Sequence, residues 1–139
     1  MKKLHLYLFT VSLLMIAISG CQKDIYGCTD PSAANYNSGA NTNNGSCTYY
    51  GNITFWTAAN FGNNITVTIQ NQSATISDIY TTGQPSSCTS DPHCATFSLV
   101  QGNYNYTANC PASTQYPQGV NWSGTATVSA NGCQLYQLN

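Results

Sequence analysis

The stretch "FSLVQGNYNYTANC", residues 97–110, carries the pattern that decides the fold class of this chain. Apolar and polar residues alternate on both sides of Gln101-Gly102, which is typical of two half-buried strands joined by a tight turn. Pairing across the turn would bring four large side chains to one face, in the pairs Phe97–Tyr106 and Leu99–Tyr104. The stretch therefore predicts a β-hairpin whose apolar face must be covered by another sheet.

The same two-residue alternation recurs through residues 51–139. Helix-forming residues are scarce there, whereas Thr, Tyr and Val favour strands. Besides the hairpin, the alternating segments span residues 53–57, 65–69, 74–80, 120–128 and 133–138. Turn residues separate these segments, so that the pattern amounts to about seven short strands. We expect an all-β domain, a single antiparallel sandwich of two sheets that bury their apolar faces against each other.

Part of this region resembles known bacterial domains. "FSLVQGNYNYTA" is similar to the F-x-L-x-x-G-x-Y-x-Y-x-A stretch of small sandwich modules of the prealbumin-like and carboxypeptidase-regulatory-like kinds. Phe55-Trp56, Trp122-Ser123-Gly124 and the last segment look like a domain that recurs in small Bacteroidota lipoproteins. The resemblance implies an immunoglobulin-like or prealbumin-like sandwich over residues 51–139, and it implies no particular activity.

Residues 1–20 have the features of a cleaved export signal. Two lysines precede an apolar run over residues 4–18, which is too short to span a bilayer comfortably. Ile18-Ser19-Gly20-Cys21 resembles the lipobox of bacterial lipoproteins. That resemblance implies cleavage before Cys21, a diacylglycerol on its sulfur and a fatty acid such as palmitate on its new amine. The alternative is an ordinary cleaved signal that leaves Cys21 as a spare thiol.

Residues 21–26 would form a lipidated tether. Within it, Gln22, Lys23 and Asp24 resemble the short signal that exports some Bacteroidota lipoproteins to the outer face of the outer membrane. The resemblance implies a surface-exposed protein anchored in the outer membrane, with the periplasmic face as the alternative.

Residues 27–50, "GCTDPSAANYNSGANTNNGSCTYY", form a polar segment bracketed by Cys28 and Cys47. A disulfide between these two cysteines would stabilise the segment by about 3 kcal/mol. The segment resembles a secreted Bacteroidota repeat, GCTDP-x-A-x-NY-x-P-x-A-x-x-DDGSC-x-Y, in which an acidic pair replaces the Asn-Asn found here. Asp30 is the only carboxylate left, so we expect no tight calcium site. We expect a disulfide-stapled spacer with Tyr36 packed inside.

The chain has seven cysteines, an odd number that is explained if Cys21 carries lipid. Apart from the pair in the spacer, the remaining four are Cys88, Cys94, Cys110 and Cys133. They allow three connectivities. We prefer Cys88–Cys94 with Cys110–Cys133, and Cys88–Cys133 with Cys94–Cys110 is a competing arrangement.

The sparse charge excludes one class of partner. After the signal, the charged residues are Lys23, Asp24, Asp30, Asp78 and Asp91, with no Arg and no Glu. Nucleic-acid binding needs clustered cations that displace counterions, and a single lysine does not provide them. We therefore expect no nucleic-acid partner.

The sequence contains no convincing catalytic or metal-binding group. Asp91 and His93, with Ser90 nearby, lie on a turn next to Pro92, where neighbouring residues rarely converge into a triad. His5 departs with the signal and the cysteines are expected to be oxidised, so no metal site is expected. The scattered acids offer no pair for glycoside hydrolysis. We expect a non-enzymatic protein without a cofactor.

Aromatic residues are more numerous than a small core needs. Trp56, Phe61 and Tyr116 are candidates for stacking on sugar rings, although Trp56 could equally belong to the core. Trp122 alternates with Ala126 and is expected inside. We expect a non-catalytic surface module for adhesion, assembly or envelope structure, whose partners are the membrane and surface proteins or glycans. The alternative is a carbohydrate-binding surface module that uses exposed aromatics.

Overall fold

The computed structural model describes residues 22–89 and 91–139. The expected signal peptide, the lipidation site Cys21 and Ser90 of the Asp91–His93 turn lie outside the described residues. The described part of the chain is all-β and contains no helix. None of it forms a helix long and apolar enough to cross a membrane.

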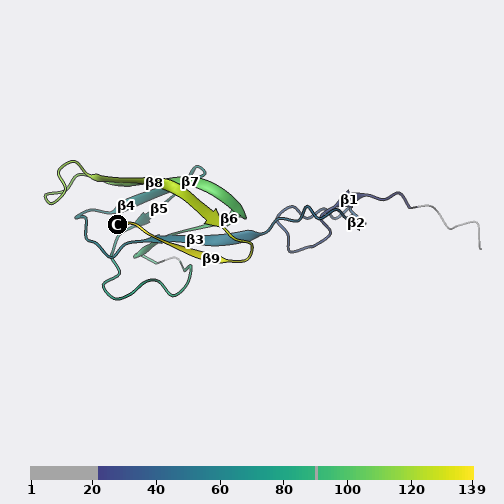
Figure 1. Cartoon of the computed structure of the whole chain (residues 1–139), viewed down its shortest axis with the longest axis horizontal. Coiled ribbons are helices and arrows are strands. Elements are labelled where there is room, and N and C mark those ends of the chain that lie inside the picture. Colours follow the sequence, from purple (N-terminus) through teal and green to yellow (C-terminus); the bar gives the residue numbers. More distant parts are fainter. Residues whose placement is uncertain (1–21, 90) are drawn as a thin grey trace, which may run out of the picture.

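Two sheets make up the body of the protein (Figure 1). The three-stranded sheet has the order β6-β3-β9 and consists of β3 (Tyr50–Trp56), β6 (Cys94–Val100) and β9 (Cys133–Gln137). The four-stranded sheet has the order β5-β4-β7-β8 and consists of β4 (Ile65–Ile69), β5 (Gln72–Ile76), β7 (Gly102–Cys110) and β8 (Val120–Val128). The body is thus built from short strands, as the alternating sequence predicts, but the strand expected over residues 74–80 covers Gln72–Ile76 instead, and residues 77–80 form no strand.

The core lies between the two sheets and is formed by one face of each. In β4, Ile65, Val67 and Ile69 are buried whereas Thr66 is exposed, which is the expected two-residue alternation. Buried residues of both sheets form one apolar cluster. Phe55 of β3 is fully buried at its centre, where its ring packs against three aromatic rings, those of Phe97, Tyr106 and Tyr136.

The expected hairpin between residues 97 and 106 is wrong, because β6 and β7 belong to different sheets. β6 pairs with β3, so that Leu99 faces Gly51 across the ladder, while β7 pairs with β4 and β8. The chain crosses between the sheets at Gln101, whose amide donates to the carbonyl of Tyr49 at 2.7 Å. A hairpin and a crossing bury the same alternate residues, so local alternation does not distinguish them.

The expectation of purely antiparallel sheets is also wrong at one position. β9 runs parallel to β3, whereas β6 on the other side of β3 is antiparallel. The turn that leads into β9 packs closely on β3, because the amide of Asn52 donates to the carbonyl of Gly132 at 2.8 Å. A Cβ added at Gly51 would overlap the carbonyl oxygen of Ser129, so this approach needs glycine.

The disulfides confirm one expected pair and correct the others. Cys28 is bonded to Cys47, as expected, but Cys133 is bonded to Cys88, so the preferred pairs Cys88–Cys94 and Cys110–Cys133 are wrong. Cys94 and Cys110 are buried free thiols, so the competing arrangement is correct only for Cys88–Cys133. Cys110 belongs to the core cluster, whereas the Cys94 thiol contacts the Tyr80 hydroxyl and lies outside that cluster.

The segment between β5 and β6 covers the outer face of the three-stranded sheet (Figure 1). Trp56 of β3 packs edge-on against Tyr80 of this segment, with ring centroids 5.9 Å apart. Thr96 of β6 donates its hydroxyl to the carbonyl of Thr89 at 3.1 Å. Because both faces of β3 are covered, Thr54 is also buried, and its hydroxyl forms a hydrogen bond with that of Thr96 at 2.8 Å.

The spacer extends from the end of the body where β3 begins (Figure 1). Its two short strands, β1 (Tyr26–Gly27) and β2 (Thr42–Asn43), pair in parallel. Asp30 accepts a hydrogen bond from the Tyr49 hydroxyl at 2.8 Å, which ties the start of the segment to its end. Tyr36 is 44% exposed, so the expectation that it packs inside the segment is wrong. Gly27, Cys28 and Ala33 are the buried residues instead.

Candidate functional site

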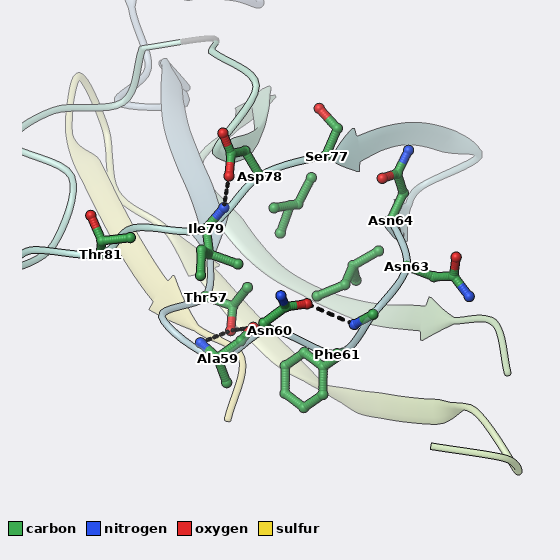
Figure 2. Close-up of a pocket in the computed structure, with 13 residues that line it drawn as sticks. Thr57, Ala59, Asn60, Phe61, Asn63, Asn64, Ser77, Asp78, Ile79 and Thr81 are labelled. Atoms are coloured by element: carbon green, nitrogen blue, oxygen red, sulfur yellow. Dashed lines mark hydrogen bonds between the residues drawn. The ribbon is translucent and has the colours of Figure 1, made fainter. Parts of the chain in front are cut away.

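A pocket of about 390 Å³ lies beyond the end of β3, between the β3–β4 loop and the segment that follows β5 (Figure 2). Ile65 and Ile76, which are both 2% exposed, contribute apolar surface to its lining. The lining also includes polar side chains from both walls: Asn60, Asn63, Asn64, Asp78 and Thr81. The pocket therefore combines apolar surface with amide, hydroxyl and carboxylate groups.

The first wall is the β3–β4 loop, whose shape is set by two side chains that bond to its own backbone. The Thr57 hydroxyl accepts from the amide of Ala59 at 3.1 Å, and Asn60 Oδ1 accepts from the amide of Gly62 at 2.8 Å (Figure 2). Gly62 has a φ of 85°, and a Cβ there would lie 2.8 Å from the side chain of Ser113. Glycine is therefore required both by the backbone conformation and by the close neighbour.

The β7–β8 connection holds this loop from behind. Asn63 Nδ2 donates to the carbonyl of Ala112 at 2.8 Å, and the hydroxyl of Ser113 donates to the carbonyl of Phe61 at 2.9 Å. The buried thiol of Cys110 lies 3.3 Å from the carbonyl oxygen of Asn63. These contacts hold the Asn63 side chain and the loop in one position without a ligand.

The second wall, residues 76–81, is attached to the turn that precedes β6. The amides of Ser77 and Asp78 both donate to the carbonyl of Pro92, at 2.8 and 3.1 Å. Asp78 Oδ1 accepts from the amide of Ile79 at 2.8 Å (Figure 2). The amide of Tyr80 donates to the carbonyl of Thr57 at 3.0 Å, so this wall is also joined to the first.

Behind the second wall, His93 lies between two carboxylates. Its Nε2 is 3.4 Å from Asp78 Oδ2, and its Nδ1 is 3.4 Å from Asp91 Oδ1. The sequence predicted that Asp91 and His93 would not form a catalytic triad with Ser90, which lies outside the described residues; Asp91 and His93 are in contact, and Asp78 joins them. No local pattern links Asp78 to His93, because the two lie about 15 residues apart, near opposite ends of the segment between β5 and β6. The three side chains join the pocket wall to the start of β6.

Next to His93, a chain of hydrogen bonds runs from Cys94 through Tyr80 to Asp91. The Cys94 thiol lies 3.8 Å from the Tyr80 hydroxyl, which donates to Asp91 Oδ2 at 3.1 Å. Desolvation raises the pKa of Tyr80 to about 12, and hydrogen bonding to Cys94 and Asp91 adds to the shift. Burial alone would raise the pKa of Asp91, but hydrogen bonds from the His93 amide and the Tyr80 hydroxyl hold it below its ordinary value.

This cluster is poorly suited to nucleophilic chemistry. Burial raises the pKa of the Cys94 thiol, so the reactive thiolate is disfavoured at neutral pH. Tyr80 stays a neutral hydrogen-bond donor for the same reason. Both ring nitrogens of His93 face carboxylates, which leaves neither aimed at a nucleophile. The arrangement holds segments together. Among residues 22–89 and 91–139, no three His, Cys, Asp or Glu side chains are grouped to hold a metal ion.

The aromatic residues that the sequence suggested as candidates for ligand stacking are largely buried. Trp56 is 6% exposed, and Phe61 is 7% exposed between the rings of Tyr116 and Trp122. Tyr116 is half-buried. Phe61 lines the pocket, whereas Trp56 and Tyr116 are not among its lining residues. Trp122 is partly buried against the core, as expected, and its indole N–H donates to the carbonyl of Asn139 at 2.8 Å.

Comparisons of the chain with models of protein families, with curated proteins and with solved structures find no match. Function is therefore inferred from the residues of this chain alone.

Proposed function

We propose that this chain is a lipoprotein of the outer membrane whose β-sandwich of about seven strands is displayed at the cell surface as a non-catalytic module for adhesion, assembly or envelope structure. The lipobox-like Ile18-Ser19-Gly20-Cys21 and the export-like Gln22-Lys23-Asp24 support the anchor and its location. Two or more acyl chains at Cys21 would hold the protein stably in a membrane, since one chain anchors only marginally.

The observation that carries the proposal is the linear order of the molecule (Figure 1). The first described residues lie at the end of the spacer remote from the body, and the spacer joins the body at the start of β3. The Cys28–Cys47 disulfide and the Asp30–Tyr49 hydrogen bond give the spacer a defined shape. A lipid at Cys21 would therefore leave the body projecting away from the membrane.

Mass spectrometry of the protein extracted from membranes tests the anchor. We expect a mature chain that begins at Cys21 and carries acyl chains, and a Cys21→Ser variant that is no longer processed. Protease added to intact cells should digest the body if it is displayed outside. An unmodified N-terminus would overturn the anchor, and full protection in intact but not lysed cells would overturn surface display.

Carbohydrate binding is the second candidate function, and the pocket supports it better than the aromatic residues do. The burial of Trp56 and Phe61 leaves little ring surface for a flat stacking platform. The pocket, in contrast, offers amides and a carboxylate beside apolar surface, which is the mixture that sugar rings require (Figure 2).

A further inference from the structure

We propose that the pocket between residues 57–64 and 76–81 binds a single neutral sugar residue, with Asp78 and Asn60 hydrogen-bonded to its hydroxyls and with Ala59 and Ile79 against its apolar face. The inference deepens the carbohydrate-binding candidate and rests on display of the body at the cell surface. It replaces the stacking platform of exposed aromatics with a pocket that has defined walls.

The size and lining of the pocket fit one ring better than a long chain. Its volume of about 390 Å³ lies near the lower end of the roughly 300–1,000 Å³ typical of small-molecule sites. Ile65 and Ile76 line the pocket but are only 2% exposed, so the apolar C–H face of a ring would lie mainly against the exposed Ala59. Ile79, which is half-buried, adds to this surface from the second wall.

The polar groups supply both donors and acceptors, which hydroxyls require because each one can donate and accept. Asn60 Oδ1 accepts a hydrogen bond from the amide of Gly62, so Asn60 Nδ2 is left to donate to a ligand hydroxyl. Asn63 donates its Nδ2 to the carbonyl of Ala112 and its side chain points away from the pocket (Figure 2), so the acceptor is Asp78 instead. Asp78 Oδ1 accepts the amide of Ile79 and Oδ2 lies 3.4 Å from His93 Nε2, and the remaining lone pairs of the carboxylate can accept from hydroxyls, to which a carboxylate bonds strongly.

The charge of the pocket selects against ionic sugars. Asp78 is the one ionisable side chain among the lining residues, and the rest of the polar lining is neutral amide and hydroxyl. A ligand carboxylate or phosphate would meet Asp78 without a compensating cation in the lining. A quaternary amine would lack the open aromatic faces that stabilise such cations, because Phe61 is 7% exposed.

The position of the pocket suits recognition at a distance from the membrane. The spacer joins the first residue of β3, whereas the pocket loop follows its last residue, so the two lie at opposite ends of that strand (Figure 1). Both walls are held by hydrogen bonds to the rest of the body, which reduces the ordering that a ligand would have to impose.

Titration of the whole lipidated protein in detergent, followed by ligand-observed NMR, tests the ligand class. The probes are neutral monosaccharides (glucose, galactose, mannose, fucose and N-acetylglucosamine), glucuronic acid and tetramethylammonium. We expect saturable binding of at least one neutral sugar and binding of glucuronic acid that is weaker by about tenfold or more. No binding of any neutral sugar, or tighter binding of glucuronic acid or tetramethylammonium, overturns the proposal.

Two variants locate the site. Ala59→Trp adds a large ring at an exposed position of the lining and should abolish sugar binding, while Ala130→Trp makes the same change on an exposed turn outside the lining and should not. Asp78→Asn keeps the size of the side chain and should lower affinity by about tenfold or more. Thermal unfolding shows that each variant is folded. Undiminished binding by folded Ala59→Trp overturns the assignment.

The two proposals fail separately. If the mature protein carries no acyl chains at Cys21 but binds a neutral sugar, membrane display is overturned and the sugar-binding pocket stands. Acylated, surface-exposed protein that binds no neutral sugar would leave display standing and overturn the pocket.

Discussion

Replacing Cys88 and Cys133 together with alanine removes the disulfide that ties the segment after β5 to the edge strand β9. The two cysteines are 45 positions apart, and closing a loop of that length stabilises a protein by about 4 kcal/mol in the loop-entropy description. Because native domains have a net stability of roughly 5–15 kcal/mol, we expect the double variant to lose about a quarter of this stability or more and to unfold at a clearly lower urea concentration.

Urea denaturation followed by tryptophan fluorescence measures this loss. Both tryptophans of the chain, Trp56 and Trp122, belong to the body, so the signal reports unfolding of the body alone. The matched control is Cys28→Ala with Cys47→Ala, which removes the other disulfide from the spacer. We expect the control to leave the midpoint of the body unchanged. An equally unchanged midpoint in the variant without Cys88 and Cys133 would refute the reasoning.

Thiol counting separates the pairing itself from its energetic effect. With Cys94 and Cys110 free, Cys94→Ala should lower the number of free thiols in the unfolded, non-reduced protein by one and leave both disulfides intact. If Cys94 were bonded to Cys88 instead, the same variant would release a new thiol and the count would rise. Peptide mapping that links Cys110 to Cys133 would contradict the structure directly.

Three further predictions follow from packing and titration. Gly51→Ala places a methyl group against the carbonyl of Ser129 and should cost about 1–3 kcal/mol, seen as a lower urea midpoint; full stability would contradict this close approach. Phe55→Ala empties the centre of the core and should cost about 3–5 kcal/mol in the same assay, and a negligible loss would contradict its central position. The pKa of Tyr80 is raised from its ordinary value of 10 to about 12, so the unfolded chain releases this proton first. The stability that Tyr80 contributes to the folded state through this proton is therefore complete below pH 10 and is lost as the pH rises from 10 to 12. Tyr80→Phe should therefore unfold with a shallower loss of stability over that pH range, and identical pH profiles would refute the shift.

The alternation of apolar and polar residues predicted which side chains of β4, β6 and β7 face the core, but not in β3, where both faces are buried. Val67, Phe97 and Ala108 are buried at the positions that a two-residue period assigns to the apolar face. The side to which a side chain points is a property of each strand separately, because successive side chains leave a strand on opposite sides whatever its neighbours are. The Cys28–Cys47 bond was equally predictable, since both cysteines bracket one short polar segment.

The sites were harder to predict because their parts come from separate segments. His93 meets Asp78 because the two ends of the segment between β5 and β6 come together, where the amides of Ser77 and Asp78 donate to the carbonyl of Pro92. The pocket likewise needs the β3–β4 loop and the end of β5 at one end of the body. Isolated Asn residues in a chain rich in Asn carry no local signal that distinguishes a pocket wall from an ordinary turn.

The sequence by itself determined the all-β class, the inward and outward faces of the strands and the stapled spacer. These depend on the pattern of adjacent residues. Only the tertiary structure decided that β6 and β7 lie in different sheets, that β9 runs parallel to β3, and that Cys88 meets Cys133. The physical reason is that an apolar face is satisfied by any apolar surface, so burial alone does not choose the neighbour. That choice depends on how the whole chain closes around one core.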